Sequence, residues 1–291
     1  MRPLHTFFAA LVAVLWGANF VAAKFGTAFF PPFMLTGIRF TIVSLILIPF
    51  VPRPTLAQLK KIAVLSTMST LHFSLIFVAI YLGLDIADSS LIGQLGVPFA
   101  CILGALFLND RIGIWRISGI VIAFIGTAIV AGAPNILAHM PGFYAALAST
   151  LTWGVANILI KRIEGLNSMS LLAWMALCTV PMLFVLSLVF ECSVWPNLAD
   201  APMTAVLGLI YTALCSTIMA YGLWYYLLGK YNVSQVTPYS LLTPIFGIGF
   251  GELFFKEELT MPVIVGGIVT IIGVAIIVLR RPKTIMLGEA T

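Results

Sequence analysis

The stretch WGANFVAAK, residues 16–24, returns later in the chain as WGVANILIK, residues 153–161. In both copies Trp-Gly lies within an apolar run, an asparagine follows about one helical turn later, and a lysine ends the segment eight residues after the tryptophan. Trp153 lies 137 residues after Trp16 in a chain of 291 residues, so close to half the chain separates the copies. Recurrence at this spacing indicates that one structural unit is duplicated.

The composition is that of a membrane protein. Hydrophobic residues make up 61% of the chain and charged residues only 9%, whereas soluble domains carry about 25% charged residues. Apolar runs of about 20 residues, long enough to cross a bilayer as helices, recur along the whole sequence. We therefore expect one all-α membrane domain whose partner is the lipid bilayer. The net charge of +5 reports membrane topology, and no nucleic-acid partner is expected.

The apolar runs, with the prolines and glycines between them, predict ten transmembrane helices. Their expected ranges are 4–24, 33–51, 62–82, 88–108, 112–132, 142–160, 170–190, 203–228, 234–254 and 261–280.

The lysines and arginines predict the orientation of these helices, because positively charged residues gather in cytoplasmic loops. With the N-terminus in the cytoplasm, 12 of the 15 lie on the inner side, which predicts that both termini are cytoplasmic. The three outer ones are Lys24, Arg39 and Lys256.

The duplication extends beyond the opening copies. From Asp110 and from Glu257, glycines follow at the same steps of nine and sixteen residues. A proline, Pro98 in one case and Pro244 in the other, lies within the fourth and the ninth predicted helix. The second half therefore matches the first in order and spacing.

Each half is expected to hold five helices, over residues 1–134 and 141–284. Because five is odd, the second half enters the membrane from the opposite face. This predicts two inverted five-helix repeats, an architecture typical of transporters that bind their substrate near the middle of the membrane.

Several stretches together resemble the EamA group of the drug/metabolite transporter superfamily. They are WGANFVAAK, PPFMLTGIRF (31–40), FLNDRI (107–112), FKEEL (255–259) and YGLWYYLLGKY (221–231), and their order and doubling carry the resemblance. The last of them is similar to the eighth helix of bacterial amino-acid and metabolite exporters. The resemblance implies ten helices around a central cavity and export of small metabolites. Small four-helix relatives use a glutamate in their first helix for proton coupling, and the first helix here has no carboxylate.

His72 is the first candidate for substrate binding. A polar side chain at the centre of a membrane helix costs about 2.5–3.5 kcal/mol, so each one needs a reason to be there. His72 is the eleventh residue of the 21-residue run 62–82, and its imidazole could bind substrate or carry a proton. The alternative is a histidine that only joins two helices.

Trp16 with Asn19, and Trp153 with Asn157, are the next candidates. In each pair the two side chains are about one turn apart on a similar face of the helix. A tryptophan beside an amide suits the wall of a cavity for an amphipathic metabolite. The alternatives are packing for the tryptophans and a clamp between helices for the asparagines.

Gln94 and Ser240 each precede a mid-helix proline by four residues. Proline leaves the carbonyl one turn earlier without its helical donor, so these positions are expected to offer acceptors to a cavity. The alternative for both is local repair of a kinked helix.

Arg39, Tyr221 and Tyr81 complete the predicted site. Arg39 lies seven residues after Pro32, about 10 Å into the second helix, where it could hold a substrate carboxylate. It could instead stabilise the outer gate by bonding carbonyls at helix ends, or its side chain could extend to the outer surface. Tyr221 lies deeper than the aromatic residues that follow it, and Tyr81 is a weaker candidate.

An enzyme is not expected. Asp85 and Asp88 are spaced like one magnesium-binding pair of a prenyltransferase, but the second pair that such an enzyme needs is missing from the sequence. The four cysteines are scattered, and we expect neither a metal nor a cofactor.

The sequence thus predicts a secondary transporter of the bacterial cytoplasmic membrane that exports amino acids or their derivatives by alternating access. A nucleotide-sugar or drug carrier remains an alternative, and a lipid-modifying enzyme is a more distant one. Facilitated export and proton antiport are both open, and a monomer is expected.

Overall fold

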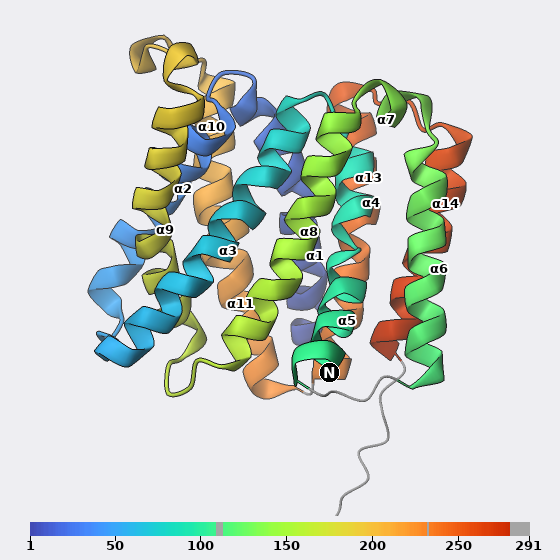
Figure 1. The fold of residues 1–291 in the computed structure, drawn as a ribbon, viewed down its shortest axis with the longest axis horizontal. Coiled ribbons are helices and arrows are strands. Elements are labelled where there is room, and N and C mark those ends of the chain that lie inside the picture. The colour runs from blue at the N-terminus through green and yellow to red at the C-terminus, as the bar shows by residue number, and fades with distance from the viewer. Residues whose placement is uncertain (109–112, 232, 280–291) are drawn as a thin grey trace, which may run out of the picture.

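In the computed structural model, residues 1–108, 113–231 and 233–279 are described, and their regular elements are all helices (Figure 1). The predicted turn at 109–112 and the predicted end of the second repeat, from 280 to 284, lie outside these residues. The first half contains α1 (Pro3–Thr27), α2 (Pro32–Leu47), α3 (Leu56–Tyr81), α4 (Ile86–Gly93), α5 (Gly96–Leu108) and α6 (Ile114–Ala131). After the short α7 (Pro134–Ala138), the second half contains α8 (Met140–Lys161), α9 (Ser168–Phe190), α10 (Met203–Tyr211), α11 (Ala220–Lys230), α12 (Val233–Val236), α13 (Leu242–Phe255) and α14 (Met261–Leu279).

Among the residues that the structure describes, nine helical stretches are long and apolar enough to cross a membrane. They correspond to the first eight predicted helices and the tenth. The predicted ninth helix, over 234–254, is interrupted: α12 is followed by a 3₁₀ helix, η5 (Thr237–Leu241), and only then by α13. The expectation of one continuous helix there was wrong.

The predicted fourth helix is interrupted as well. It is divided into α4 and α5, and the break comes just before Pro98. Pro98 is the third residue of α5, and Pro244 is the third residue of α13. A proline is tolerated in a first turn because its missing N–H has no helical acceptor there. Each break therefore turns an interior proline into one near the start of a new helix.

The eighth predicted helix departs from α-helical geometry at its centre. Between α10 and α11 the chain forms a π-helix, η4 (Thr212–Met219). The hydroxyl of Thr217 donates to the carbonyl of Thr212, five residues earlier, at 2.7 Å. Wider turns of this kind are rare and often occur at functional sites.

The helices of the two halves pack in corresponding pairs. α1 packs against α13 and α10, while α8 packs against α5 and α3. α2 packs against α9, and α6 lies beside α14 at one edge of the bundle (Figure 1). The chain starts α1 at the N-terminal side of the bundle, whereas it starts α8 at the opposite side, next to α7.

Glycines decide how closely α6 and α14 approach. A Cβ at Gly119 would lie 2.7 Å from the carbonyl oxygen of Gly273, and one at Gly266 would lie 2.6 Å from that of Gly126. A Cβ at Gly126 would also collide with the backbone nitrogen of Thr270. These glycines therefore allow α6 and α14, the fifth and tenth predicted helices, to pack closely. Gly17 packs on Phe246 of α13, and Gly154 packs on Phe99 of α5, in the same manner.

Carboxylates cap the start of two helices at the side opposite the N-terminus. Glu191 accepts hydrogen bonds from the N–H groups of Phe33 and Met34 at 2.8 and 3.0 Å, at the start of α2. Glu257 accepts from those of Ile86 and Ala87 at 3.0 and 3.1 Å, at the start of α4. Both carboxylates satisfy N–H groups that have no acceptor within their helix.

Candidate functional site

Arg39 lies at the centre of the candidate site. Its side chain is only 2% exposed, so it does not extend to the surface, and that alternative is wrong. Nε and Nη2 donate to Oγ1 of Thr217 at 2.9 and 2.7 Å. The guanidinium lies over three phenylalanine rings, with centroids 5.3, 5.2 and 5.6 Å away for Phe40, Phe73 and Phe77.

The described part of the chain provides no acid to neutralise the charge of Arg39. Among the described residues, both ion pairs involve Lys24, and none involves Arg39. A buried cation normally pairs with a carboxylate, because its desolvation costs several kcal/mol. Aromatic faces and one hydroxyl offset part of that cost. The arrangement leaves a planar fork of N–H donors, of the shape that binds a carboxylate with two hydrogen bonds.

The π-helix explains how the Thr217 hydroxyl can accept hydrogen bonds from Arg39. The Thr217 hydroxyl donates to Thr212, and its lone pairs accept from the guanidinium. A hydroxyl has one donor and two acceptor positions, so these contacts use all of them. Arg39 is therefore held in place without an opposing charge.

Tyr221 and Trp16 form one wall beside Arg39. Tyr221, one turn after Thr217, is close enough to Arg39 to interact with it electrostatically. The rings of Tyr221 and Trp16 are 5.4 Å apart, and Trp16 also packs on Trp224 at 5.2 Å. The indole Nε1 of Trp16 is buried and has no hydrogen-bond partner among the described residues. This wall is aromatic and retains one unused donor.

His72 also lies near Arg39, and it packs beside Trp153. The Nδ1 of His72 is 3.0 Å from the carbonyl oxygen of Ser149, and the Ser149 hydroxyl donates to the His72 carbonyl at 2.8 Å. The imidazole and the Trp153 ring are 6.4 Å apart, and Arg39 is within electrostatic range of His72. One ring nitrogen thus joins α3 to α8. Within the described part of the chain, Nε2 makes no hydrogen bond.

The structure thus brings together five of the ten predicted site residues. They are Arg39, His72, Tyr221, Trp16 and Trp153. They come from α1, α2, α3, α8 and α11, so both halves of the chain contribute.

Among the described residues, Tyr81, Asn19 and Gln94 make no hydrogen bond or ring contact with these five, and Asn157 bonds only to the backbone of Trp153. Tyr81 is 52% exposed at the end of α3. Asn157 donates to the carbonyl of Trp153 in its own helix at 2.8 Å. Asn19 has a buried Oδ1 that lacks a partner among the described residues.

The expected free carbonyls at Gln94 and Ser240 were wrong. The carbonyl of Gln94 accepts from the N–H of Val97 at 3.2 Å, and that of Ser240 accepts from the N–H of Leu242. Tight 3₁₀ turns at the helix breaks take up the acceptors that the prolines leave. These residues mark the breaks in the two helices.

Sequence reasoning missed Thr217 and Phe73. Threonine is common in apolar helices, and nothing in the sequence predicts a π-helix at 212–219. A signal for Phe73 was available, because it follows His72 directly, but a phenylalanine in an apolar run points first to packing.

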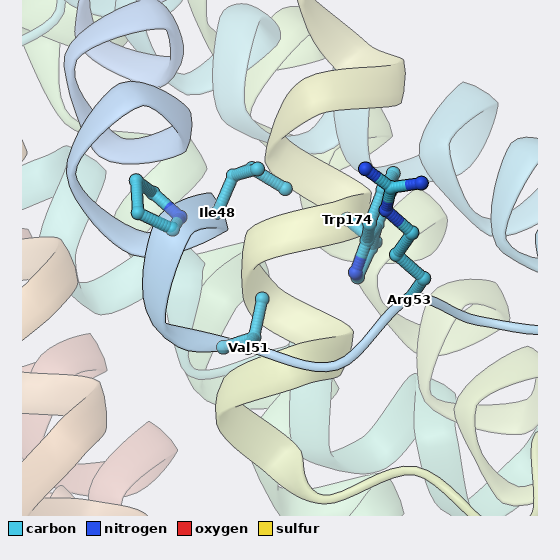
Figure 2. Close-up of a pocket in the computed structure, with 5 residues that line it drawn as sticks. Ile48, Val51, Arg53 and Trp174 are labelled. Atoms are coloured by element: carbon cyan, nitrogen blue, oxygen red, sulfur yellow. The ribbon is translucent and has the colours of Figure 1, made fainter.

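A hollow of about 550 Å³ lies apart from this cluster (Figure 2). It is lined by Ile48, Pro49, Val51, Arg53 and Trp174. Figure 2 shows Arg53 alongside the Trp174 ring, whose Nε1 donates to the carbonyl of Pro52 at 2.9 Å. The hollow begins at Ile48, directly after α2 and nine residues beyond Arg39, which corresponds to about 13 Å of helix. None of the predicted site residues lines it, so we assign the site to the Arg39 cluster.

Comparison with known proteins gives a consistent picture. The sequence matches the EamA-like transporter family over residues 4–132 and 140–279. It is 34% identical to a protein of Escherichia coli (strain K12) named probable amino-acid metabolite efflux pump, over 97% of each chain. A protein of Streptantibioticus cattleyicolor named probable terminal-alkyne amino-acid exporter is 24% identical over 92% of this chain and 91% of its own. A crystal structure with 19% identity superimposes with a TM-score of 0.64 over 95% of this chain and 96% of the other, which supports the fold.

Proposed function

This chain belongs to the EamA-like transporter family, so it is a multi-pass membrane transporter and not an enzyme, and we propose that it exports small metabolites that carry a carboxylate. Amino acids and their derivatives are the substrate class that fits best. Relatives named as amino-acid metabolite efflux pumps support export of this kind.

One observation carries the proposal: Arg39 is buried and, among the described residues, has no acidic partner. A transporter that binds an anion must have the opposing charge ready but not neutralised by its own carboxylate. A substrate carboxylate would complete the buried ion pair, and its hydrogen bonds to the guanidinium would be charge-assisted. Release of the substrate would return Arg39 to Thr217 and the phenylalanine rings.

The surrounding groups suit the rest of an amino acid. Trp16, Trp153 and Tyr221 present aromatic faces, which attract a substrate ammonium group as well as apolar side chains. The Nε2 of His72 could accept a hydrogen bond from the same ammonium. A zwitterion would therefore find a partner for each charge.

Two inverted five-helix repeats would supply the alternating access. The pairing of helices supports this: α1 with α13 corresponds to α8 with α5, and α1 with α10 corresponds to α8 with α3. α2 with α9 and α6 with α14 each correspond to themselves when the halves are exchanged. The breaks before Pro98 and Pro244 occupy matching positions too. An axis in the membrane plane would relate the halves.

The proposed location is the bacterial cytoplasmic membrane, with the N-terminal side of the bundle in the cytoplasm. The excess of lysine and arginine on that side supports the orientation. The relatives named as efflux pumps are bacterial.

A nucleotide-sugar carrier fits less well. A nucleoside diphosphate carries at least two negative charges, and Arg39 is the one cation of the described cluster. A single guanidinium balances one carboxylate and leaves a diphosphate undercompensated.

Efflux from proteoliposomes tests the proposal. Vesicles are loaded with radiolabelled amino acids, and the initial rate of efflux is measured for the wild-type protein, for Arg39→Lys and for Arg39→Gln. We expect at least about a tenfold loss with lysine, which keeps the charge but not the planar fork, and a larger loss with glutamine. Arg53→Gln, in the hollow of Figure 2, is the control and should retain the wild-type rate. Full activity of Arg39→Gln would remove Arg39 from the site.

A further inference from the structure

A second group of charges lies at the side opposite the N-terminus, which we assign to the outside. It joins Lys24 of α1, Asp85 and Asp88 at the start of α4, Asn135 of α7 and Glu257 before α14. Lys24 Nζ is 2.6 Å from Glu257 Oε1 and 3.6 Å from Asp85 Oδ1. Lys24 thus pairs with two carboxylates, and the described residues give Asp88 no ion pair.

Glu257 accepts most of the hydrogen bonds that this group donates to carboxylates. It receives Lys24 and the N–H groups of Ile86 and Ala87. Lys256, with a φ of 52°, ends α13 in a left-handed turn, and the next residue is directed back over Gly251 toward α4. Glu257 therefore has one cationic donor and two backbone donors in this arrangement.

Asp85 and Asp88 have fewer hydrogen-bond donors than Glu257 has. The single amide nitrogen of Asn135 donates to Oδ2 of both, at 2.7 and 3.3 Å, so the two oxygens lie within about 6 Å of each other. Asp88 is only 2% exposed, and its Oδ1 is buried without a hydrogen-bond partner among the described residues. Two ionised carboxylates so close together, with one amide between them, would repel each other.

Burial raises the pKa of Asp85 above its usual value, and the charge of Glu257 raises it further, while Lys24 opposes the shift. Within the described part of the chain, the charged groups that act on the two aspartates are Lys24, Glu257, His139 and the aspartates themselves. A neutral acid at one aspartate would remove the repulsion and would need fewer donors than a carboxylate does.

We propose that Asp85 and Asp88 together bind one proton whenever the outer side of the protein is closed, and that opening this side releases it. The closed arrangement holds α1, α4, α7 and the segment before α14 together through these charges. Opening would hydrate both aspartates and allow both to ionise. This inference does not depend on the identity of the substrate, because closure takes up a proton whether or not substrate is bound.

The direction of the pH dependence follows from linkage. A group whose pKa is raised in the closed state stabilises that state at low pH, and this stabilisation is lost as the pH rises through the raised pKa. Acid therefore favours the closed outer side and alkali favours the open one. Each unit of difference in pKa between the two states changes their ratio by about tenfold.

The distance between spin labels at the outer ends tests the proposal without any substrate. Labels are placed at Leu82→Cys, just before α4, and at Phe254→Cys, at the end of α13, after Cys101, Cys178, Cys192 and Cys215 have been replaced. Pulsed electron paramagnetic resonance is recorded in sodium-free buffer at about pH 5 and about pH 9. These values lie below and above the raised pKa expected for a buried carboxyl group. We expect the wild-type protein to shift from short to long distances as the pH rises. Asp88→Asn, which mimics the neutral acid, should remain at short distances at both pH values.

Glu191→Gln is the matched control. Glu191 is also buried and also caps a helix, but Lys24, Asp85 and Asp88 are not among its recorded partners. This variant should keep the wild-type pH response. Asp85→Asn should lose the response as Asp88→Asn does. Agreement between the two aspartate variants would exclude a folding defect in one of them as the cause. Identical distances at both pH values in the wild-type protein would overturn the proposal. So would a pH response that persists in both aspartate variants, or a response to added sodium at constant pH that replaces the response to protons.

Discussion

At the scale of single residues, the arginine of α2 has an unusual set of neighbours. Arg39 is enclosed by three phenylalanine rings and a threonine, and the described residues give it no opposing charge. Such a group is expensive to bury, so its retention needs a compensating use. Binding a carboxylate that comes and goes is the use that fits a transporter.

His72 makes a prediction at the same scale, because its two ring nitrogens have different roles. The side-chain amide of asparagine can replace the Nδ1–H group as the donor to the carbonyl of Ser149, but asparagine has no atom at the position of Nε2. We expect His72→Asn to keep wild-type thermal stability in detergent and to lose about tenfold in amino-acid efflux, the size expected for one lost hydrogen bond to a charged group.

Thermal unfolding separates this from a structural role. His72→Ala loses the contact with Ser149 as well and should be both less stable and less active. If His72→Asn transports at the wild-type rate, the histidine only joins α3 to α8.

Depth in the membrane is a guide to several residues of the Arg39 cluster. Arg39, His72 and Tyr221 are polar or ionisable residues within long apolar runs, and the cost of placing them there marks them from sequence alone. Residues that bond to their own helix lie at the same depth as residues that face the centre. Asn157 is a polar residue at a similar depth, yet its side-chain amide donates a hydrogen bond to the carbonyl of Trp153 in its own helix.

At the scale of elements, the sequence predicts where helices lie but not where they deviate. Apolar length is a property of a segment, so nine of the ten predicted helices have a counterpart long enough to cross a membrane among the described residues. The break before Pro244 and the π-helix at 212–219 depend on a few backbone hydrogen bonds and on what packs around them. Thr217 illustrates the difficulty, since its partner Arg39 is 178 residues away.

The contact between α6 and α14 gives a prediction of its own. A methyl group at Gly126 would collide with Thr270 and with the carbonyl of Gly266, both part of a rigid helix backbone. We expect Gly126→Ala to destabilise the protein by about 1–3 kcal/mol, measured as a lower midpoint of thermal unfolding by tryptophan fluorescence.

Gly249→Ala is the control for this measurement. No atom of the described residues lies within 4 Å of a Cβ at Gly249, so alanine there should be neutral or slightly stabilising through its better helix propensity. Equal midpoints for Gly126→Ala and Gly249→Ala would show that α6 and α14 do not pack as described.

At the scale of the whole molecule, helices of each half pack against helices of the other half. The first helix of each half packs on the broken helix of the other, so a change at one break would be felt by the opposite half. Arg39, Trp16 and His72 come from the first half, and Trp153 and Tyr221 come from the second. A site shared in this way would open to one side and then to the other as the halves move, which is what alternating access requires.

Counterflow in proteoliposomes tests whether a carboxylate is what the protein recognises. Vesicles with an excess of one unlabelled compound inside are placed in a trace of labelled amino acid, and accumulation of label is recorded. We predict that an internal amino acid drives accumulation, and that the amine left by removing its carboxyl group does not. Equal accumulation with the amino acid and with its amine would contradict the assignment of Arg39 as the carboxylate site.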